Sequence, residues 1–239
     1  MDPVKAYKAL LRRLKKANPR DQAMQLAVGG NFDATGALER DLLIRHGLKK
    51  TDYLIDVGCG SGRLAKPLSE FLTGKYLGID VIPDLVNYAR AQVARSDWKF
   101  EVTDGFCIPE EDGKADMVCF FSIFTHLLHE YSYVYLGEAK RVLKPGGKII
   151  FSFLDFAVPS HWGVFRSNVE GIGRSGHLNM FISRDAITVW AKRLNLRIEV
   201  IVNGDEPHVP QSHPASPPNG DSTRQDSRFG QSVCVLRKQ

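Results

Sequence analysis

The sequence predicts an α/β fold of the doubly wound type, in which helices cover both faces of a mostly parallel sheet. Short apolar runs alternate with segments of helical periodicity from residue 53 to residue 154, and a glycine cluster directly follows the first run. This alternation is typical of parallel strands joined by right-handed crossovers. No helix fits between the last two apolar runs, which therefore predict a hairpin. We expect a seven-stranded sheet whose last strand is antiparallel.

The individual elements follow from the spacing of apolar residues. Strands are predicted where apolar residues stand together or alternate, and helices where they recur every third or fourth position. Ser183 is a favourable N-cap for the last helix. The predicted strands are 53–57, 76–80, 99–103, 117–121, 148–154, 196–202 and 232–236, and the predicted helices after the N-terminal one are 37–46, 61–72, 83–95, 127–143 and 183–194.

A helical cap is expected at residues 1–48, ahead of a domain at 49–239 that contains the sheet. Apolar residues recur at helical spacing from Val4 to Leu14, and Pro19 ends this pattern. The helix has one apolar and one basic face. Two interpretations stay open: a cap packed on the domain with a solvated basic face, or a surface that also associates weakly with an anionic membrane or an acidic partner.

The net charge of +5 is concentrated in this first helix. Residues 1–20 hold seven basic side chains and one acid, whereas the rest of the chain holds 25 basic and 26 acidic residues. The pI of 9.0 therefore describes one segment. We do not expect a nucleic-acid groove in the body of the protein.

Composition indicates a globular protein of the cytoplasm. Apolar residues make up 43% and charged residues 25% of the chain, close to the average for soluble domains. No run approaches the roughly 18 apolar residues of a membrane span, and charges occupy the N-terminus, where a signal peptide needs an apolar segment. The four cysteines form no C-x-x-C pair, so we expect reduced, mostly buried thiols, with neither a disulfide framework nor a metal site.

The stretch DVGCGSGR, from Asp56 to Arg63, predicts the ligand. In a doubly wound sheet, ligands bind beyond the carboxyl end of the first strand, where this loop lies. Its G-x-G-x-G spacing differs from the G-x-G-x-x-G of dinucleotide sites. A carboxylate at Asp56 would repel a pyrophosphate and favour a ligand that carries a positive charge. Asp80 ends the second strand, where an acid commonly accepts hydrogen bonds from ribose hydroxyls. S-adenosylmethionine satisfies both demands, and an NAD-dependent dehydrogenase is disfavoured.

The chain also resembles a known family at these residues. LIDVGCGSGR, YLGID, VTDGF, ADMVCFFSIFTHLL and RVLKPGGKIIFSF occur in that order and look like the motifs of class I S-adenosylmethionine-dependent methyltransferases. The resemblance covers roughly residues 50 to 155. It implies methyl transfer with S-adenosylmethionine as cofactor. The positions that it implies for binding the cofactor, together with Asp56, are Gly58, Gly60, Gly62, Asp80, Val81, Asp104, Gly105, Phe106 and Ser122. A purely structural role stays open for Asp80 as a buried acid and for Asp104 as a turn residue.

His126 is the candidate catalytic base. It follows the fourth predicted strand, close to where the methyl group would lie, and a base is needed only if the acceptor must lose a proton. Phosphobase methyltransferases carry a histidine at a similar offset, together with a tyrosine from the N-terminal segment. Here the segment that looks equivalent contains Phe32 instead. A structural hydrogen bond at the start of a helix is the alternative role for His126, and His129 is expected at the surface.

Residues that select the acceptor are expected on the rim formed by 155–182 and by the Pro-rich segment 203–230, which predicts either a lid or a disordered loop. The candidates are Phe32, His161, Trp162, Phe165 and His177, although these aromatic residues would also suit simple packing of the cap. We expect a polar small-molecule acceptor, methylated on oxygen or nitrogen. Nucleic acid is disfavoured because FFSI replaces the N/D-P-P-Y/F motif of base methyltransferases. Methylation of a protein and noncatalytic binding of S-adenosylmethionine also stay open.

Overall fold

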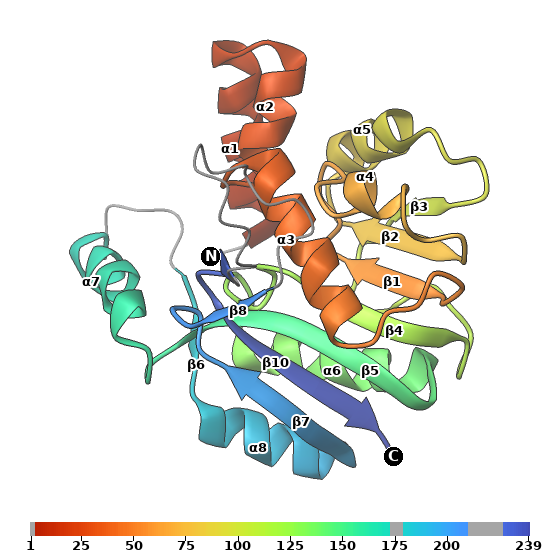
Figure 1. Ribbon diagram of the computed structural model, residues 1–239. Coiled ribbons are helices and arrows are strands. Elements are labelled where there is room, and N and C mark those ends of the chain that lie inside the picture. Colours follow the sequence, from red (N-terminus) through yellow and green to blue (C-terminus); the bar gives the residue numbers. More distant parts are fainter. Residues whose placement is uncertain (1–2, 173–178, 210–226) are drawn as a thin grey trace, which may run out of the picture.

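A mixed β-sheet forms the centre of the protein, whose computed structural model describes residues 3–172, 179–209 and 227–239. Its main strands are β1 (Leu54–Val57), β2 (Tyr76–Asp80), β3 (Lys99–Val102), β4 (Ala115–Phe120), β5 (Leu143–Asp155), β7 (Leu196–Val202) and β10 (Ser232–Lys238). They lie in the order β3-β2-β1-β4-β5-β10-β7 (Figure 1). A two-residue strand, β6 (Phe181–Ile182), adds to β5. The predicted seven-stranded sheet is confirmed.

Strand β10 is antiparallel to both of its neighbours, β5 and β7. The first five strands of the sheet pair in parallel. The connection from β7 to β10 contains no helix among the residues described on either side of 210–226. The chain therefore returns to the sheet as a hairpin and inserts its last strand between two earlier ones. The predicted antiparallel last strand is confirmed.

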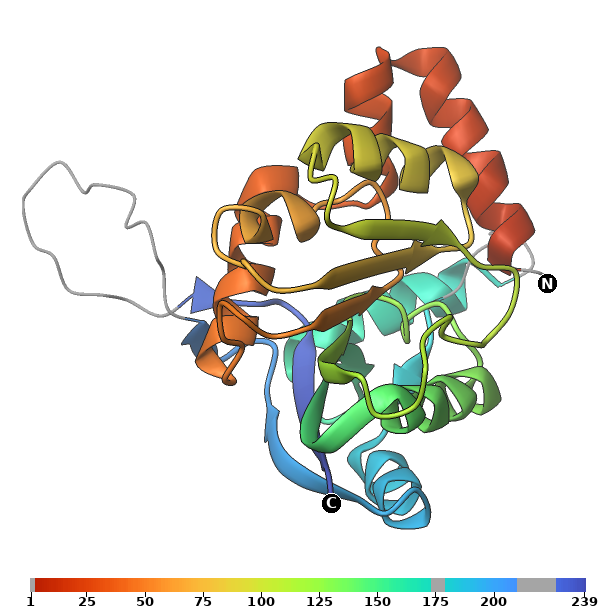
Figure 2. The ribbon, with the colours of Figure 1, turned by 90° about the vertical axis from the view of Figure 1, so that its right-hand side faces the viewer.

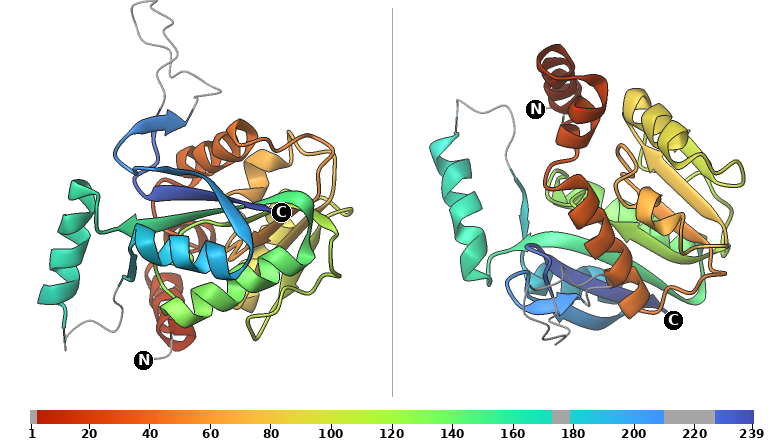
Figure 3. Two further views of the ribbon diagram at one scale, coloured as in Figure 1. Left: turned by 90° about the horizontal axis from the view of Figure 1, so that it is seen from below. Right: turned by 45° about the horizontal axis from the view of Figure 1, so that its top comes forward.

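Helices cover both faces of the sheet. One face is covered by α3 (Phe32–Arg45), α4 (Ala65–Leu68) and α5 (Pro83–Val93), and the other by α6 (His129–Val142) and α8 (Arg184–Arg193). The view from below in Figure 3 shows α6 and α8 side by side across the second face. Each face buries its own apolar cluster. This two-sided burial explains why the central strands read as nearly continuous apolar runs.

The N-terminal helices α1 (Pro3–Ala17) and α2 (Arg20–Ala27) form a pair at one end of the molecule (Figure 2). Leu11 of α1 and Met24 of α2 are buried against Leu85 and Tyr88 of α5 in a third apolar cluster. The predicted apolar face of the first helix therefore packs on the protein. The exposed part of that helix is the basic face.

Four helices differ from the prediction, and one of them, α2, lies where the sequence predicted no helix. α4 is much shorter than 61–72, because Pro67 lacks the N–H that a continuous helix needs. α3 begins five residues before the predicted start, where the side chain of Asn31 accepts the N–H of Ala34 at 3.1 Å. Segment 155–182, for which the sequence predicted no helix or strand, contains a 3-10 turn (Pro159–His161) and helix α7 (Trp162–Glu170).

The two rim segments lie on different parts of the molecule. α7 stands apart from the other helices, as the right-hand view of Figure 3 shows. The described ends of 203–230 form a small ribbon of β8 (Pro207–Val209) and β9 (Ser227–Arg228), and Val209 is buried near α3. The remainder of the predicted lid lies outside the described residues.

Candidate active site

A cavity of about 620 Å³ lies at the carboxyl ends of the parallel strands. The loops that follow β1, β2, β3 and β4 line it, and so do residues of α1 and of the segment after α2. β1 and β4 are the neighbours at which the strand order reverses, the usual ligand position in this fold. The predicted residues that line this cavity are Asp56, Gly58, Gly60, Asp80, Val81, Asp104, Gly105, Phe106, Ser122 and His126.

The glycine loop after β1 turns tightly against its surroundings. Gly58, Gly60 and Gly62 have φ angles of 78°, 53° and 87°, a region that disfavours side chains. A Cβ atom at Gly58 would lie 2.0 Å from Ile123, and one at Gly60 would lie 2.6 Å from Val28. Gly62 does not line the cavity, and a Cβ there would lie 3.1 Å from Ala89 of α5. The first two glycines thus keep backbone at the cavity wall, and the third lets the loop pack on α5.

Asp80 is held at the end of β2 by backbone hydrogen bonds. One carboxylate oxygen accepts the N–H of Gly60 at 3.0 Å, and the other accepts the N–H of Ile82 at 2.9 Å. Burial raises the pKa of Asp80, and these hydrogen bonds lower it in part. A carboxylate oxygen has a second lone pair. Asp80 can therefore accept two further hydrogen bonds from a ligand in the cavity.

Asp56 lies at the floor of the cavity. It is 3% exposed, and its Oδ2 accepts the hydroxyl proton of Tyr76 at 2.7 Å. Cys119 donates to Oδ1 at 3.6 Å. Burial is the main cause that raises the pKa of Asp56 to about 7. Asp56 is inside β1, so its side chain projects from one face of the sheet, where it contacts Tyr76 of β2 and Cys119 of β4.

An aromatic wall borders the cavity beyond β3. Phe106 stacks on Tyr131 of α6 with ring centroids 4.5 Å apart, and its ring meets Tyr135 edge-on. Tyr135 also donates a hydrogen bond to the carbonyl of Gly105 at 3.3 Å. A Cβ at Gly105 would meet nothing within 4 Å, and Asp104 beside it is exposed. The wall therefore leaves open space for a flat ligand group next to a carboxylate.

Ser122 and His126 form the side of the cavity after β4. Ser122 has a φ of 59°, rare for a residue with a side chain. Its N–H donates to Ser152 at 2.8 Å, and its hydroxyl accepts from Gln231 of the segment before β10 at 3.0 Å. The turn is thus fixed by β5 and by the residue that precedes β10. His126 is half-buried and lines the cavity four residues later.

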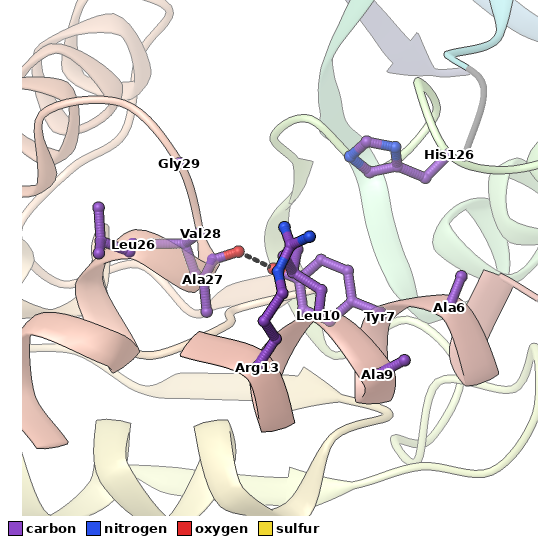
Figure 4. A pocket seen from close by; sticks show the side chains of 10 residues that line it. All are labelled: Ala6, Tyr7, Ala9, Leu10, Arg13, Leu26, Ala27, Val28, Gly29 and His126. Atoms are coloured by element: carbon purple, nitrogen blue, oxygen red, sulfur yellow. Dashed lines mark hydrogen bonds between the residues drawn. The ribbon is translucent and has the colours of Figure 1, made fainter. Parts of the chain in front are cut away.

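A second cavity, also about 620 Å³, adjoins the first beneath the cap. Tyr7, Val28 and His126 line both cavities. Figure 4 shows Tyr7 and Arg13 on α1 and His126 across from them. The hydroxyl of Tyr7 donates to the carbonyl of Ala27, and burial is the main cause that raises its pKa. The phenol therefore stays neutral and ties α1 to the end of α2.

The strands that build the first cavity also carry the family signature. A family model for a methyltransferase domain matches residues 55–151, from β1 to β5. This match supports the resemblance of the chain to class I S-adenosylmethionine-dependent methyltransferases. The chain is 27% identical over 184 residues to a malonyl-(acyl-carrier protein) O-methyltransferase of Hahella chejuensis. The aligned residues cover 72% of this chain and 62% of that protein.

Two further proteins are similar to this chain. A ubiquinone biosynthesis O-methyltransferase of Xanthomonas oryzae pv. oryzae is 26% identical over 155 residues, covering 61% of this chain and 63% of that protein. The chain thus spans somewhat less than two thirds of the length of the curated relatives it matches. The solved structure of magnesium protoporphyrin IX methyltransferase from Synechocystis PCC 6803 with bound S-adenosylhomocysteine matches with a TM-score of 0.64. It is 15% identical and covers 97% of this chain and 94% of that one. This likeness shows the fold.

Several residues predicted to contact the acceptor lie away from both cavities of this methyltransferase fold. Phe32 is buried at the start of α3, where the Lys66 ammonium lies 5.8 Å from its ring centroid. His161 is buried, and its Nδ1 accepts the N–H of Asp155 at 2.9 Å. Its Nε2 therefore carries the proton and donates to the carbonyl of Gly230 at 3.2 Å. His161 thus joins the end of β5 to the segment before β10.

The aromatic residues of α7 are also remote from the cavities. Trp162 is 47% exposed and meets Phe165 edge-on, and Phe165 packs against Phe181 of β6. This is the packing role that the sequence left open for them. His177 lies outside the described residues. Among the described residues of the same rim segment, Met180 lines the first cavity.

Some residues of the first cavity that the sequence did not indicate come from the cap. Tyr7, Val28, Glu39 and Arg63 line the first cavity. Arg63 belongs to the quoted glycine stretch, so its place could have been expected. The other three are far from every family motif, and no local pattern marks them.

Within the described residues, no helix is long and apolar enough to cross a membrane.

Proposed function

We propose that this protein transfers the methyl group of S-adenosylmethionine to an oxygen or nitrogen atom of a small-molecule acceptor. The observation that carries the proposal is the position of Asp80. Its carboxylate is buried at the cavity wall, held by the glycine loop, with lone pairs left for two ribose hydroxyls. The other cavity residues suit the remaining parts of the same ligand.

The glycine loop and Asp56 suit the methionine end of the cofactor. Gly58 and Gly60 keep the loop free of side chains, so a ligand can approach its backbone. Asp56 at the floor supplies a carboxylate for the ammonium group. When bound, S-adenosylmethionine supplies an electrophilic methyl group on a sulfonium sulfur. The residues around the glycine loop bind and orient the cofactor that carries this group.

The aromatic wall suits the adenine ring. Phe106 and Tyr131 present stacked rings beside the open space at Gly105, and Asp104 offers an acceptor for the exocyclic amine. Val81 and Ser122 also line this cavity. These residues would hold the cofactor along the carboxyl ends of β1 to β4, with its methyl group toward the cap.

His126 is the residue proposed to take a proton from the acceptor. It lines both cavities, so an acceptor bound beneath the cap would lie between His126 and the methyl group. Holding the two reactants together in a space closed by α1 accounts for much of the expected rate enhancement. A base adds to it where the acceptor is a hydroxyl that must be deprotonated.

The acceptor class is supported by the relatives and by charge. The curated relatives named above are O-methyltransferases. The body of the chain carries no excess of basic residues, and the basic ones are concentrated at 1–20. Both points favour a small molecule over nucleic acid. Oligonucleotides and protein extracts belong in the acceptor screen as competing acceptor classes.

Calorimetry with S-adenosylhomocysteine tests the cofactor assignment. We expect binding to the parent protein and no binding of NAD. Asp80→Asn should weaken binding by more than tenfold, because hydrogen bonds to a charged group contribute roughly 1.5 to 3 kcal/mol each. Asp84→Asn is the control: Asp84 is a surface acid paired with Lys15, so affinity should stay unchanged. NAD binding alone would overturn the proposal.

Activity is tested by release of S-adenosylhomocysteine. The screen should include hydroxylated, amine-bearing and sugar-bearing metabolites, with oligonucleotides and protein as further arms. Turnover with a small molecule supports the proposal. Turnover with nucleic acid or protein alone would refute the acceptor class, and cofactor binding without turnover in any arm would favour a noncatalytic binding protein.

A further inference from the structure

We propose that the cavity beneath the cap binds an acceptor with an apolar body and one carboxylate, which pairs with Arg13. This inference rests on the proposed function and deepens it, because it names the acceptor chemistry of the same site. It is drawn from the lining of the second cavity, in which every residue except His126 comes from the first 29 positions of the chain.

The second cavity has the size and lining of a small-molecule site. Its volume of about 620 Å³ lies in the usual range for ligand pockets. Six of its lining residues are apolar: Ala6, Ala9, Leu10, Leu26, Ala27 and Val28. Gly29 adds backbone, and the polar side chains are Tyr7, Arg13 and His126. A mostly apolar acceptor would therefore bury its body here.

The polar residues divide between two ends of this cavity. Tyr7 and His126 are half-buried and also line the cofactor cavity, so they mark the inner end, where methyl transfer would occur. Arg13 and Leu26 are exposed and line only the second cavity, so they mark its mouth. The acceptor atom would lie at the inner end and a second functional group at the mouth.

The charge at the mouth is positive. Among the described residues, Arg13 has no hydrogen-bond or ion-pair partner, and no acidic residue lines this cavity. The guanidinium is always charged and matches a carboxylate with two parallel N–H donors. The excess of basic residues at 1–20 adds a positive field that attracts anions. Arg13 is therefore placed to bind the anionic end of an acceptor whose apolar part lies inside.

Binding of matched probes tests this inference without turnover. The probes are 2-naphthoate and 3-phenylpropanoate, each compared with its uncharged amide, and affinities are measured by calorimetry in the presence of saturating S-adenosylhomocysteine. We expect each carboxylate to bind about tenfold more tightly than its amide, the effect of one charged hydrogen-bonded contact. Arg13→Gln should remove this preference and leave the affinity for S-adenosylhomocysteine unchanged.

Arg12→Gln is the matched control. Arg12 is the exposed neighbour of Arg13 on α1 and lines neither cavity, and its loss changes the net charge equally. It should keep the preference for carboxylates. Ala9→Trp, which fills the cavity, should weaken both members of each pair.

The outcomes separate the two proposals. Failure to bind S-adenosylhomocysteine would refute the proposed function. Normal binding of S-adenosylhomocysteine, with no binding of either pair or with equal affinity for carboxylate and amide, would overturn only the inference about the acceptor. Equal loss of preference in Arg12→Gln and Arg13→Gln would also overturn it, because it would show a general effect of charge.

Discussion

Arg63 and Glu39 form a buried ion pair that joins the glycine loop to helix α3. Nε of Arg63 donates to Glu39 at 3.2 Å, and the Glu39 side chain is 1% exposed. Nη1 of Arg63 also donates to the carbonyls of Val28 and Gly29, at 2.8 and 3.2 Å. One side chain thus connects the cofactor loop, α3 and the chain leaving the cap. The cap is held over both cavities by a residue of the family motif.

Breaking this pair should destabilise the protein. Arg63→Met should lower the free energy of unfolding by about 3 kcal/mol or more, because it leaves the carboxylate of Glu39 buried without a cation. The measurement is urea unfolding followed by circular dichroism. The double variant Arg63→Met with Glu39→Leu should lose less stability than the sum of the single variants, since it removes both charges. Strictly additive losses would contradict an ion pair.

Gly36 and Gly137, each inside a helix, should respond oppositely to alanine. A Cβ at Gly36 of α3 would lie 2.2 Å from the backbone oxygen of Arg63, whereas one at Gly137 of α6 would meet only Leu194, at 3.8 Å. Gly137→Ala should stabilise the protein by about 0.5 to 1 kcal/mol, the helix propensity difference. Gly36→Ala should destabilise it despite the same propensity gain. Thermal unfolding of both variants gives the answer; stabilisation by both would show that α3 does not touch the loop so closely.

Binding of S-adenosylhomocysteine should depend on pH through Asp56. The pKa of Asp56 is raised to about 7, so the ligand-free protein carries a proton there at lower pH. If its carboxylate pairs with the ammonium group of the ligand, only the ionised form binds well. Affinity should then fall by about tenfold from pH 8 to pH 6, following the ionised fraction. Calorimetry across this range measures it.

Asp56→Asn is the control for this pH dependence. The amide oxygen can still accept from Tyr76, but it does not ionise, so the affinity should be lower at pH 8 and nearly constant down to pH 6. An unchanged pH dependence in Asp56→Asn would assign the titration to another group.

His126→Ala should slow turnover while leaving the affinity for S-adenosylhomocysteine unchanged. With a hydroxyl acceptor from the screen, we expect a loss in kcat of about a hundredfold or more, the usual contribution of a general base. His129→Ala is the matched control, because His129 is exposed and its Nε2 donates to the carbonyl of Phe181 at 2.9 Å, away from both cavities. Steady-state kinetics measures kcat for both variants and the parent protein. If His126→Ala has the same kcat as the parent, His126 has a structural role and is not the base.

Much of the fold could be predicted because it depends on short-range patterns. The apolar spacing indicated every main strand, and the absence of a helix between the last two runs indicated the antiparallel β10. Local exceptions also have local causes, such as Pro67 in α4 and the Asn31 cap of α3. The predicted cofactor positions, other than Gly62, came together because the carboxyl ends of parallel strands share one edge of the sheet.

The sequence by itself therefore determined the sheet, the glycine loop and the acid at the end of β2. Only the tertiary structure decided which residues line the second cavity. Tyr7 and Arg13 reach the second cavity because Leu11 and Met24 pack the helical pair on α5, a contact between distant segments that no local pattern encodes. His161 lies away from both cavities for the same kind of reason, because its ring forms hydrogen bonds with the backbone of Asp155 and Gly230. Helix periodicity shows which face of a helix is apolar, but the partner it packs against sets where its other residues point.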